Sequence, residues 1–390
     1  MSKTSKSNHI EKIIFGGNGL TRIDGCVTFV PFSAPGDEAT LKITQKKKHY
    51  LTASIETLIK KGAERVQPKC PHYKTCAGCQ LQHLSYKGQL EAKQGFIQEA
   101  LRIHNVSITP SPLQWNYRSH IRLNLAQEKE GFKMGYIGWD NRSMIEPTIC
   151  PLFLEDPSFF TLLKDSLLIL PNKGIKSASM RIFKQEDKIY LAFSTFPQLP
   201  KSLIKFPFAE GTSYKSPGKE KQLGIFPFSP YGFMQSNAPV TEKIYQTIAD
   251  WVGPEPKRIL DLYCGVGITS SLLAKGGHEV IGIEANRALL PSSKEVQFIC
   301  SKVESALPKL LKTFRPDLIL VNPPRTGLSK EVPPLLQAET ILYLSCMPST
   351  LARDIERLND RYSIESVEAF DMFPQTTHVE TLLKLRKNSS

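Results

Sequence analysis

The chain has 390 residues, of which 41% are hydrophobic and 22% charged, and this composition excludes global disorder, collagen and a long coiled coil. Its length predicts two or three domains. Lys and Arg number 50 against 37 Asp and Glu, and the formal net charge of +13 indicates a polyanionic partner without separating nucleic acid from an anionic membrane. No apolar run approaches the roughly 20 residues that cross a bilayer, and the polar N-terminus is not a secretory signal, so we expect a cytoplasmic protein that does not bind a membrane.

The first part of the chain has the pattern of short strands and turns. From Ile13 to about Leu58, apolar stretches are separated by glycines and by the turn at Pro35-Gly36-Asp37. Turns at this spacing predict a small all-β barrel. The lysine run at 46–48 adds positive charge, although such a run is more often a solvated surface than a binding site.

Cysteines gather in the next part. Cys70, Cys76 and Cys79 fall within ten residues, and Cys150 lies further along the chain. Cysteines of a cytosolic protein are rarely disulfide-bonded, and four thiolates suit either a 4Fe–4S cluster or a structural zinc ion. Spacing alone does not decide between the two. We expect a helix near 85–103, then a region rich in strands and prolines that extends to about 233.

From about residue 240, strands and helices alternate. Apolar runs at 258–263, 280–283, 318–321 and 341–344 are separated by stretches with helical spacing, which predicts an α/β fold with a doubly wound parallel sheet. The last two segments, 362–370 and 378–385, predict a hairpin at the sheet edge.

The first of these strands runs into a glycine turn that could hold a cofactor. Gly265 and Gly267 let the backbone approach a ligand closely, and Glu284 at the end of the next strand suits the two hydroxyls of a ribose. The turn lacks the third glycine of a dinucleotide fingerprint. S-adenosyl-L-methionine therefore fits this pattern better than NAD.

Three further segments carry reactive side chains near other strand ends. Cys346 lies at the end of the strand that begins at 341, just before a helix whose N-terminus is expected to lower the pKa of the thiol; an inert buried cysteine is the alternative. Asn322-Pro323-Pro324-Arg325 ends the preceding strand, and the segment 371–380 carries His378 and Glu380.

Together these motifs resemble the RNA (uracil-5-)-methyltransferase family. They are DLYCGVG at 261–267, NPPRTGL at 322–328, SCMPSTLARD at 345–354, DMFPQTTHVE at 371–380 and FMQSN at 233–237. Upstream, residues 19–36 resemble the TRAM-type RNA-binding barrel, and the cysteine spacing resembles the iron–sulfur branch that acts on 23S rRNA. The resemblance covers nearly the whole chain.

The resemblance implies a domain plan and a reaction. The plan is a TRAM-like or OB-like β-barrel at 1–62, a β-rich central domain with an iron–sulfur cluster at 63–238, and a Rossmann-like methyltransferase domain at 239–390, with the helix near 85–103 packed on the last. The reaction is methylation of uracil C5 in RNA with S-adenosyl-L-methionine as donor. The expected partner is 23S rRNA rather than tRNA, and the expected state is a monomer.

The resemblance also implies roles for single residues. Cys346 is the nucleophile that adds at C6, and Glu380 accepts the C5 proton, so that two easier steps replace one hard step. Phe233 is a candidate to pack beside the target base, although a core aromatic is equally expected. The residues implied to bind S-adenosyl-L-methionine are Gln235, Tyr263, Gly265, Gly267, Glu284 and Asn322, and those implied to bind a 4Fe–4S cluster are Cys70, Cys76, Cys79 and Cys150.

Two alternatives stay open from the sequence. Asn-Pro-Pro at 322–324 also resembles methyltransferases that act on exocyclic amino groups and need no cysteine. The chain could also be an RNA-binding or folding factor with impaired catalysis, because the family usually has Asp where this chain has Asn322 and often Asn where it has Ile268. A methylated amino group in the product would support the first, and absence of methyl transfer the second.

Overall fold

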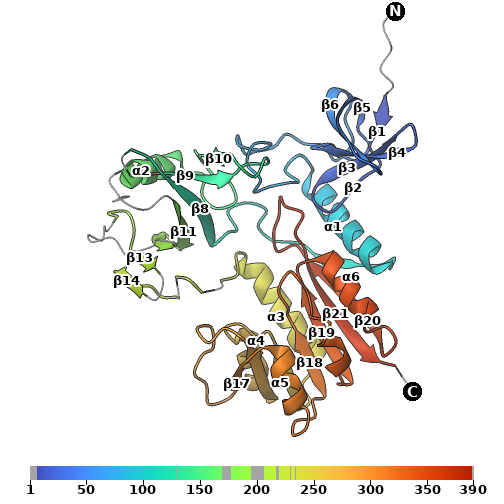
Figure 1. Cartoon of the computed structure of the whole chain (residues 1–390), viewed down its shortest axis with the longest axis vertical. Coiled ribbons are helices and arrows are strands. Elements are labelled where there is room, and N and C mark those ends of the chain that lie inside the picture. Colours follow the sequence, from blue (N-terminus) through green and yellow to red (C-terminus); the bar gives the residue numbers. More distant parts are fainter. Residues whose placement is uncertain are drawn as a thin grey trace, which may run out of the picture. The chain divides into compact units, whose positions relative to one another are not determined.

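The computed structural model describes residues 7–129, 131–168, 177–194, 206–216, 219–228, 230–232 and 234–388. The chain divides into two compact units. The first unit comprises Met1–Gln89, Leu113–Ala238 and Pro374–Thr377, and the second comprises Leu90–Pro112, Pro239–Phe373 and His378–Ser390. The three expected domains are consecutive in sequence, whereas each of these units gathers separated segments of the chain (Figure 1).

The first unit begins with a six-stranded sheet whose strand order is β1-β5-β6-β4-β3-β2. Its small core contains Ile10, Val30 and Ala53. Gly19 is required where β3 crosses this core, because a Cβ atom there would lie 2.0 Å from Ser33 Oγ. The strands are β1 (Asn8–His9), β2 (Lys12–Ile13), β3 (Asn18–Ile23), β4 (Cys26–Pro31), β5 (Glu38–Lys46) and β6 (Leu51–Lys60).

The first unit also holds a seven-stranded sheet with the order β10-β9-β8-β11-β12-β13-β14, in which only β12 and β13 are parallel. Its strands are β8 (His120–Gln127), β9 (Phe132–Ile137), β10 (Met144–Ile145), β11 (Ser177–Gln185), β12 (Lys188–Ser194), β13 (Gly211–Ser216) and β14 (Lys219–Leu223). Helix α2 (Pro157–Leu168) packs Phe160 and Leu163 into the core of this sheet. The sequence analysis expected a region rich in strands here and did not single out this helix, although the apolar residues of α2 have helical spacing.

The second unit is built on an eight-stranded sheet with the order β17-β16-β15-β18-β19-β21-β20-β7. The strands are β7 (Ser107–Thr109), β15 (Arg258–Leu262), β16 (Glu279–Glu284), β17 (Gln297–Cys300), β18 (Leu318–Val321), β19 (Thr340–Ser345), β20 (Tyr362–Phe370) and β21 (Glu380–Lys387). The five strands from β17 to β19 run parallel, which confirms the predicted methyltransferase-type sheet.

The prediction that the last hairpin forms the sheet edge is wrong. β21 lies between β19 and β20 and is antiparallel to both, and β20 is covered in turn by β7. Since β7 lies about 260 residues upstream of β20, as in the pairing of Ser107 with Glu368, no local pattern could reveal that the edge is occupied.

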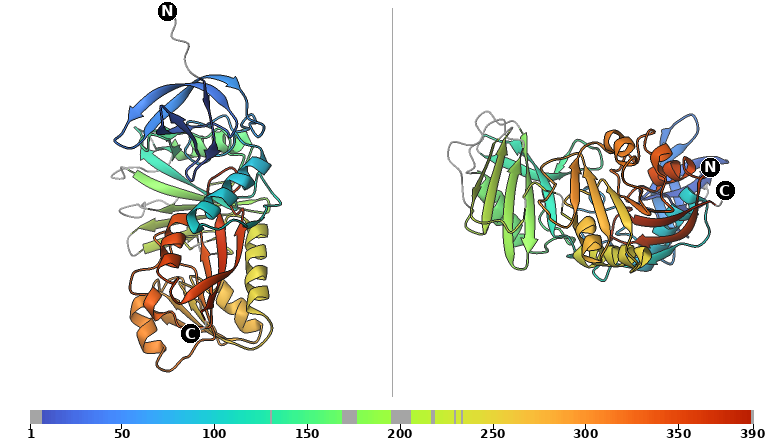
Figure 2. Two further views of the ribbon diagram at one scale, coloured as in Figure 1. Left: turned by 90° about the vertical axis from the view of Figure 1, so that its right-hand side faces the viewer. Right: turned by 90° about the horizontal axis from the view of Figure 1, so that it is seen from below.

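Helices cover both faces of this sheet (Figure 2). On one face, α3 (Ala238–Val252) and α4 (Ile268–Lys275) share a core with the strands, and on the other α5 (Val303–Leu310) and α6 (Pro348–Glu356) do so. The short helix η1 (Pro333–Leu335) precedes β19. Helix α1 (Tyr86–Leu101) packs Ile97 against Ala369 and Val379 in the second unit. No helix among the described residues has the length and apolar composition that a membrane span needs.

Candidate functional site

The carboxyl ends of the parallel strands collect most of the predicted site residues of the second unit. Tyr263 follows β15, Glu284 ends β16, Asn322 follows β18 and Cys346 follows β19. Ligands of such sheets bind beyond these strand ends, because neighbouring parallel strands bring their C-termini to one edge. The structure therefore brings these four residues to the same edge of one sheet.

The glycine turn after β15 has left-handed backbone at three positions. The φ angles are 62° at Tyr263, 56° at Gly265 and 71° at Gly267. A Cβ atom at Gly267 would lie 2.4 Å from the ring of Phe298, so this position requires glycine both for conformation and for space. The amide of Gly265 donates a hydrogen bond of 3.3 Å to Glu284 Oε2, which connects the turn to the next strand.

Glu284 is held with its carboxylate at the end of β16. Besides the bond from Gly265, its other oxygen accepts a hydrogen bond of 2.7 Å from the amide of Asn286. Each carboxylate oxygen has two lone pairs, so both oxygens keep acceptor capacity for the hydroxyls of a bound ribose. Asn322 is exposed, and its backbone amide donates to the carbonyl of Leu262 at 3.2 Å.

Beneath the turn lies a buried carboxyl group that the sequence analysis did not single out. Asp261 on β15 accepts a hydrogen bond of 2.6 Å from Ser270 of α4. Burial raises the pKa of Asp261 to about 7. Burial also raises the pKa of Tyr263 to about 12, with smaller contributions from the charges of Glu304 and Asp354. The hydrogen bond between Asp261 and Ser270 therefore connects β15 to α4, the two elements on either side of the glycine turn.

Cys346 is a half-buried thiol that is protonated in the resting protein. Burial raises its pKa, the negative charge of Glu380 raises it further, and Arg325 opposes both effects through its charge and a hydrogen bond. The expectation that the N-terminus of α6 leaves this thiol with a lowered pKa is therefore wrong. Burial is the largest contribution to the pKa of this thiol, and α6 begins two residues after it, at Pro348.

Glu380 is the first residue of β21 and pairs in register with Phe370 of β20. Burial raises the pKa of its carboxyl to about 7, and Arg325 partly offsets this. The thiol of Cys346, the carboxyl of Glu380 and the guanidinium of Arg325 thus lie close enough for their charges to interact. A thiol beside a carboxyl of such pKa can act as nucleophile and proton acceptor at neutral pH.

Arg325 was not predicted as a site residue, and a buried carboxylate anchors the loop that carries it. Asp354 of α6 accepts hydrogen bonds from the amide of Leu328 at 2.7 Å and from the hydroxyl of Tyr343 at 2.8 Å. Gly327 lies against this carboxylate, and a Cβ atom there would lie 2.4 Å from Asp354 Oδ2. The loop 322–328 is therefore fixed to the helix that follows Cys346.

Two predicted residues belong to segments outside the second unit. Gln235 belongs to the first unit, where its carbonyl accepts a hydrogen bond of 3.0 Å from Ser119 Oγ. Phe233 lies outside the described residues.

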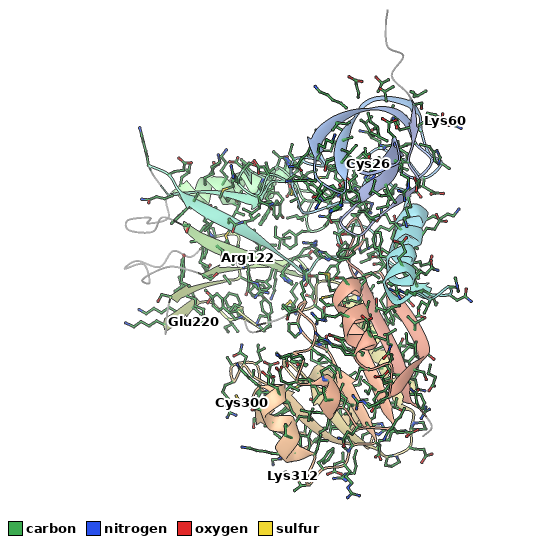
Figure 3. The ribbon with its side chains drawn as sticks, turned by 45° about the vertical axis from the view of Figure 1, so that its right-hand side comes forward. Cys26, Lys60, Arg122, Glu220, Cys300 and Lys312 are labelled. Carbon is green, nitrogen blue, oxygen red and sulfur yellow. The ribbon has the colours of Figure 1, made fainter. Side chains whose placement is uncertain are left out.

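In the first unit, Cys70, Cys76, Cys79 and Cys150 line one small cavity together with Arg118 and Tyr136. Cys26 on β4 and Cys300 on β17, both labelled in Figure 3, do not line it. Within the described part of the chain, no three His, Cys, Asp or Glu side chains form a group that could hold a metal ion.

The cavity has the chemistry of a thiolate site. Burial raises the pKa of Cys70, that of Cys76 to about 11 and that of Cys79 to about 12, and the charge of Cys150 raises all three further. Metal binding removes these protons and relieves the repulsion between neighbouring thiolates. Two buried donors belong to residues that line the cavity: Arg118 Nε, which has no hydrogen-bond partner among the described residues, and the Tyr136 hydroxyl, which lies beside the Cys150 thiol. By its chemistry this set of four thiols suits an iron–sulfur cluster or a zinc ion, although the described side chains are not gathered as closely as metal ligands.

Comparisons with known proteins cover nearly all of the chain. Residues 307–388 match the family model of tRNA (uracil-5-)-methyltransferases, and residues 9–55 match the TRAM domain. An uncharacterised RNA methyltransferase of Protochlamydia amoebophila is 38% identical over 426 aligned positions, which span 98% of each chain.

Two further relatives have named substrates. The 23S rRNA (uracil(1939)-C(5))-methyltransferase RlmD of Shewanella sediminis is 29% identical, over 96% of this chain and 94% of its own. Among solved structures, the tRNA (uracil-54, C5)-methyltransferase of Pyrococcus abyssi, in complex with S-adenosyl-L-homocysteine, is similar with a TM-score of 0.74 and 25% identity, over 97% of this chain and 100% of that one.

Proposed function

Because this chain belongs to the RNA (uracil-5-)-methyltransferase family, we propose that it methylates carbon 5 of a uridine in RNA with S-adenosyl-L-methionine as the methyl donor. We favour 23S rRNA as the substrate, since the relative of Shewanella sediminis is named for it. The TRAM-type barrel and the net charge of +13 support an RNA partner.

One observation carries the proposal most directly. The thiol of Cys346 and the carboxyl of Glu380 interact electrostatically at the edge of the sheet where Glu284 is fixed by the glycine turn. C5 methylation of uracil needs a nucleophile and a proton acceptor close to a bound methyl donor, because C5 itself is a poor nucleophile. Methyl transfer to an exocyclic amino group would not need the thiol.

The residues of the chain would act in sequence. Cys346 loses its proton and adds to C6 of the uracil, so a sulfur–carbon bond forms and electron density moves to C5. C5 then takes the methyl group as the carbon–sulfonium bond breaks. Glu380 removes the C5 proton, and the returning electron pair expels the Cys346 thiolate. A positioned carboxylate contributes roughly 10²–10⁴-fold to such a proton transfer.

The methyl donor would bind on the turn after β15. Its sulfonium supplies an electrophilic methyl group, and we assign the ribose hydroxyls to the carboxylate of Glu284. Gly265 and Gly267 would allow the close approach of the backbone, and Tyr263, Asn322 and Gln235 complete the proposed set. The uridine must leave its base stack to reach this edge of the sheet.

For the cavity in the first unit, we propose a 4Fe–4S cluster held by Cys70, Cys76, Cys79 and Cys150. Four ligands leave no open iron, so we assign the cluster a structural role, in which it maintains the RNA-binding part of the first unit. We also propose that the protein is cytoplasmic and monomeric. The monomeric state predicts sedimentation at the mass of a single chain.

Tritium release from RNA labelled at uracil C5 tests the activity. Wild-type protein with S-adenosyl-L-methionine should release tritium from a 23S rRNA transcript and less from a tRNA transcript. Cys346→Ala should abolish release, whereas Cys300→Ala, which removes an exposed cysteine at the end of β17, should leave it unchanged. Methyl incorporation without tritium release would instead indicate an amino-group methyltransferase.

A further inference from the structure

One cavity of the first unit has no role in the reaction above. It has a volume of about 520 Å³ and lies between the end of β6 and the segment that carries Cys70. Leu58 of β6 and Lys61, which follows this strand, line one part of the cavity, and residues 65–71 line another. Its volume is in the range of small-molecule sites.

The cavity is positively charged. Lys61, Lys69 and Lys74 are exposed on its lining, and no acidic residue belongs to the lining. Lys69 forms an ion pair of 2.7 Å with Glu155. Among the described residues, Lys61 and Lys74 form no ion pair, so both ammonium groups can neutralise a phosphate; Lys74 lies 5.9 Å from the ring centroid of Phe32.

The same cavity offers apolar surface between the charges. Val66 is 41% exposed, and Leu58, Pro68 and Pro71 also line the cavity. Arg65 is fixed in the lining by its contacts to the fully buried carboxylate of Asp37. A ligand with an anionic end and a flat apolar end matches this surface, and an unpaired nucleotide of RNA has both.

We propose that this cavity holds one unpaired nucleotide of the RNA substrate, with its flanking phosphates on Lys61 and Lys74 and its base against Val66. The proposal rests on RNA being the substrate, and it names a second contact site separate from the catalytic residues. Cys70 lines both this cavity and the cysteine cavity, so metal loading should fix one wall of the nucleotide site.

Binding of a fluorescent 23S rRNA fragment to the full chain tests the charged part. Lys61→Glu with Lys74→Glu should weaken binding at least tenfold near physiological salt. The plot of log affinity against log salt should also become less steep by about 1.4, because two phosphate contacts are lost. Lys309→Glu on α5, combined with Lys312→Glu in the turn that follows this helix, changes the net charge equally and should retain the wild-type slope. Equal slopes and affinities for the two double variants would overturn the proposal.

The apolar part has its own test. Val66→Asn should weaken binding several-fold without changing the salt slope, because it removes apolar contact and no charge. Unfolding midpoints establish that each variant folds, and Lys61→Gln with Lys74→Gln is the milder replacement if the Glu pair does not. Tritium release is measured separately. If the wild-type protein binds RNA through these lysines but releases no tritium, the proposed reaction is refuted and the nucleotide site is not.

Two buried donors at the cysteine cavity carry a second inference. Among the described residues, the buried Arg118 Nε has no hydrogen-bond partner, and the buried Tyr136 hydroxyl lies beside the thiol of Cys150; both residues line the cavity. A buried donor without an acceptor is costly, so Arg118 Nε indicates an acceptor that is supplied when the site is loaded, and the Tyr136 hydroxyl faces a sulfur atom of the expected ligand set. We infer that Arg118 and Tyr136 are positioning residues that donate to the sulfur atoms of the proposed cluster.

The reduction potential of the iron-loaded full chain tests this inference. Hydrogen bonds to sulfur stabilise the more negative, reduced cluster, so Tyr136→Phe should shift the potential downwards at unchanged iron content. Tyr231→Phe is the matched control, since its hydroxyl donates to the carbonyl of Phe193 at 2.8 Å and not to the cavity. Arg118→Lys, which keeps the charge but removes Nε, should also lower the potential. Potentials equal to that of the control, or zinc in place of iron in the wild type, would refute the inference.

Discussion

Lys93 and Asp371 form a completely buried ion pair in the second unit, although 278 positions separate them in the sequence. Lys93 lies on α1, and Asp371 directly follows β20. The Lys93 ammonium also donates a hydrogen bond of 3.0 Å to the carbonyl of Phe373. The pair therefore attaches the start of the segment 371–380 to α1, and Glu380 is the last residue of that segment.

Removing one partner of this pair should be strongly destabilising. Lys93→Met leaves the carboxylate of Asp371 buried without a counter-charge, and we expect the free energy of unfolding to fall by about 3–5 kcal/mol. Urea unfolding measures this. Lys93→Met combined with Asp371→Leu should recover most of the loss, because no buried charge remains; a double variant as unstable as the single one would contradict this account.

The pH dependence of the reaction should report Glu380. Its pKa of about 7 means that the carboxylate becomes available as the pH rises through neutrality, and the raised pKa of Cys346 means that thiolate also increases with pH. Both effects have the same sign, so we expect the initial rate of tritium release to rise steadily from pH 6 to pH 9. A maximum near pH 6 would exclude these assignments.

Stability should change in the opposite direction over part of this range. The folded pKa of Glu380 lies above its ordinary value, so the folded state binds more protons than the unfolded state below pH 7, and this contribution is lost as the pH rises through about 7. Glu380→Gln, which is neutral at every pH, should flatten that part of the stability profile.

Glu380→Gln should also accumulate a covalent RNA–protein adduct, visible as a slower band on a denaturing gel.

Arg325 should control the reactivity of the Cys346 thiol. Its charge and hydrogen bond oppose the burial that raises the pKa of this thiol, so Arg325→Gln should raise it further. We expect alkylation of Cys346 by iodoacetamide at pH 8 to slow by roughly threefold or more, since a shift of one pKa unit corresponds to tenfold in thiolate. Arg325→Lys should restore part of the rate. Alkylation of Cys300, followed by peptide mass spectrometry, should not change.

Gly267 tests the turn that we assign to the methyl donor. Gly267→Ala places a Cβ atom against the ring of Phe298 in a left-handed backbone, so the turn must shift, and affinity for S-adenosyl-L-homocysteine should fall at least about tenfold. Gly277→Ala is the matched control, because its φ of 89° is equally left-handed but no atom lies within 4 Å of the new Cβ. Titration calorimetry compares the two, and equal affinities would argue against this turn as the binding site.

Cys76→Ser tests the structural role of the proposed cluster. We expect loss of iron, a lower unfolding midpoint and weaker binding of RNA, with little change in the affinity for S-adenosyl-L-homocysteine. A cluster-free variant that keeps full stability and RNA affinity would refute the structural role.

Features that depend on residues near one another in the chain could be predicted from the sequence. The strand at 318–321, the glycine turn at 265–267 and the acid ending β16 follow from local apolar patterning, backbone freedom and spacing. The parallel sheet follows too, because alternating strands and helices have few other ways to pack. The cysteine spacing identified a candidate thiolate site, and the structure places those four residues around one cavity.

Features that depend on contacts between distant segments became visible only in the folded chain. The sheet edge is formed by β7 and not by the last hairpin, the loop at 322–328 is anchored by Asp354, and Lys93 reaches Asp371. The pKa of Cys346 rises although a helix follows it, because desolvation and the charge of Glu380 come from neighbours that local spacing does not reveal. Periodicity records which face of an element is apolar, whereas the charges and partners at a site depend on which elements pack around it.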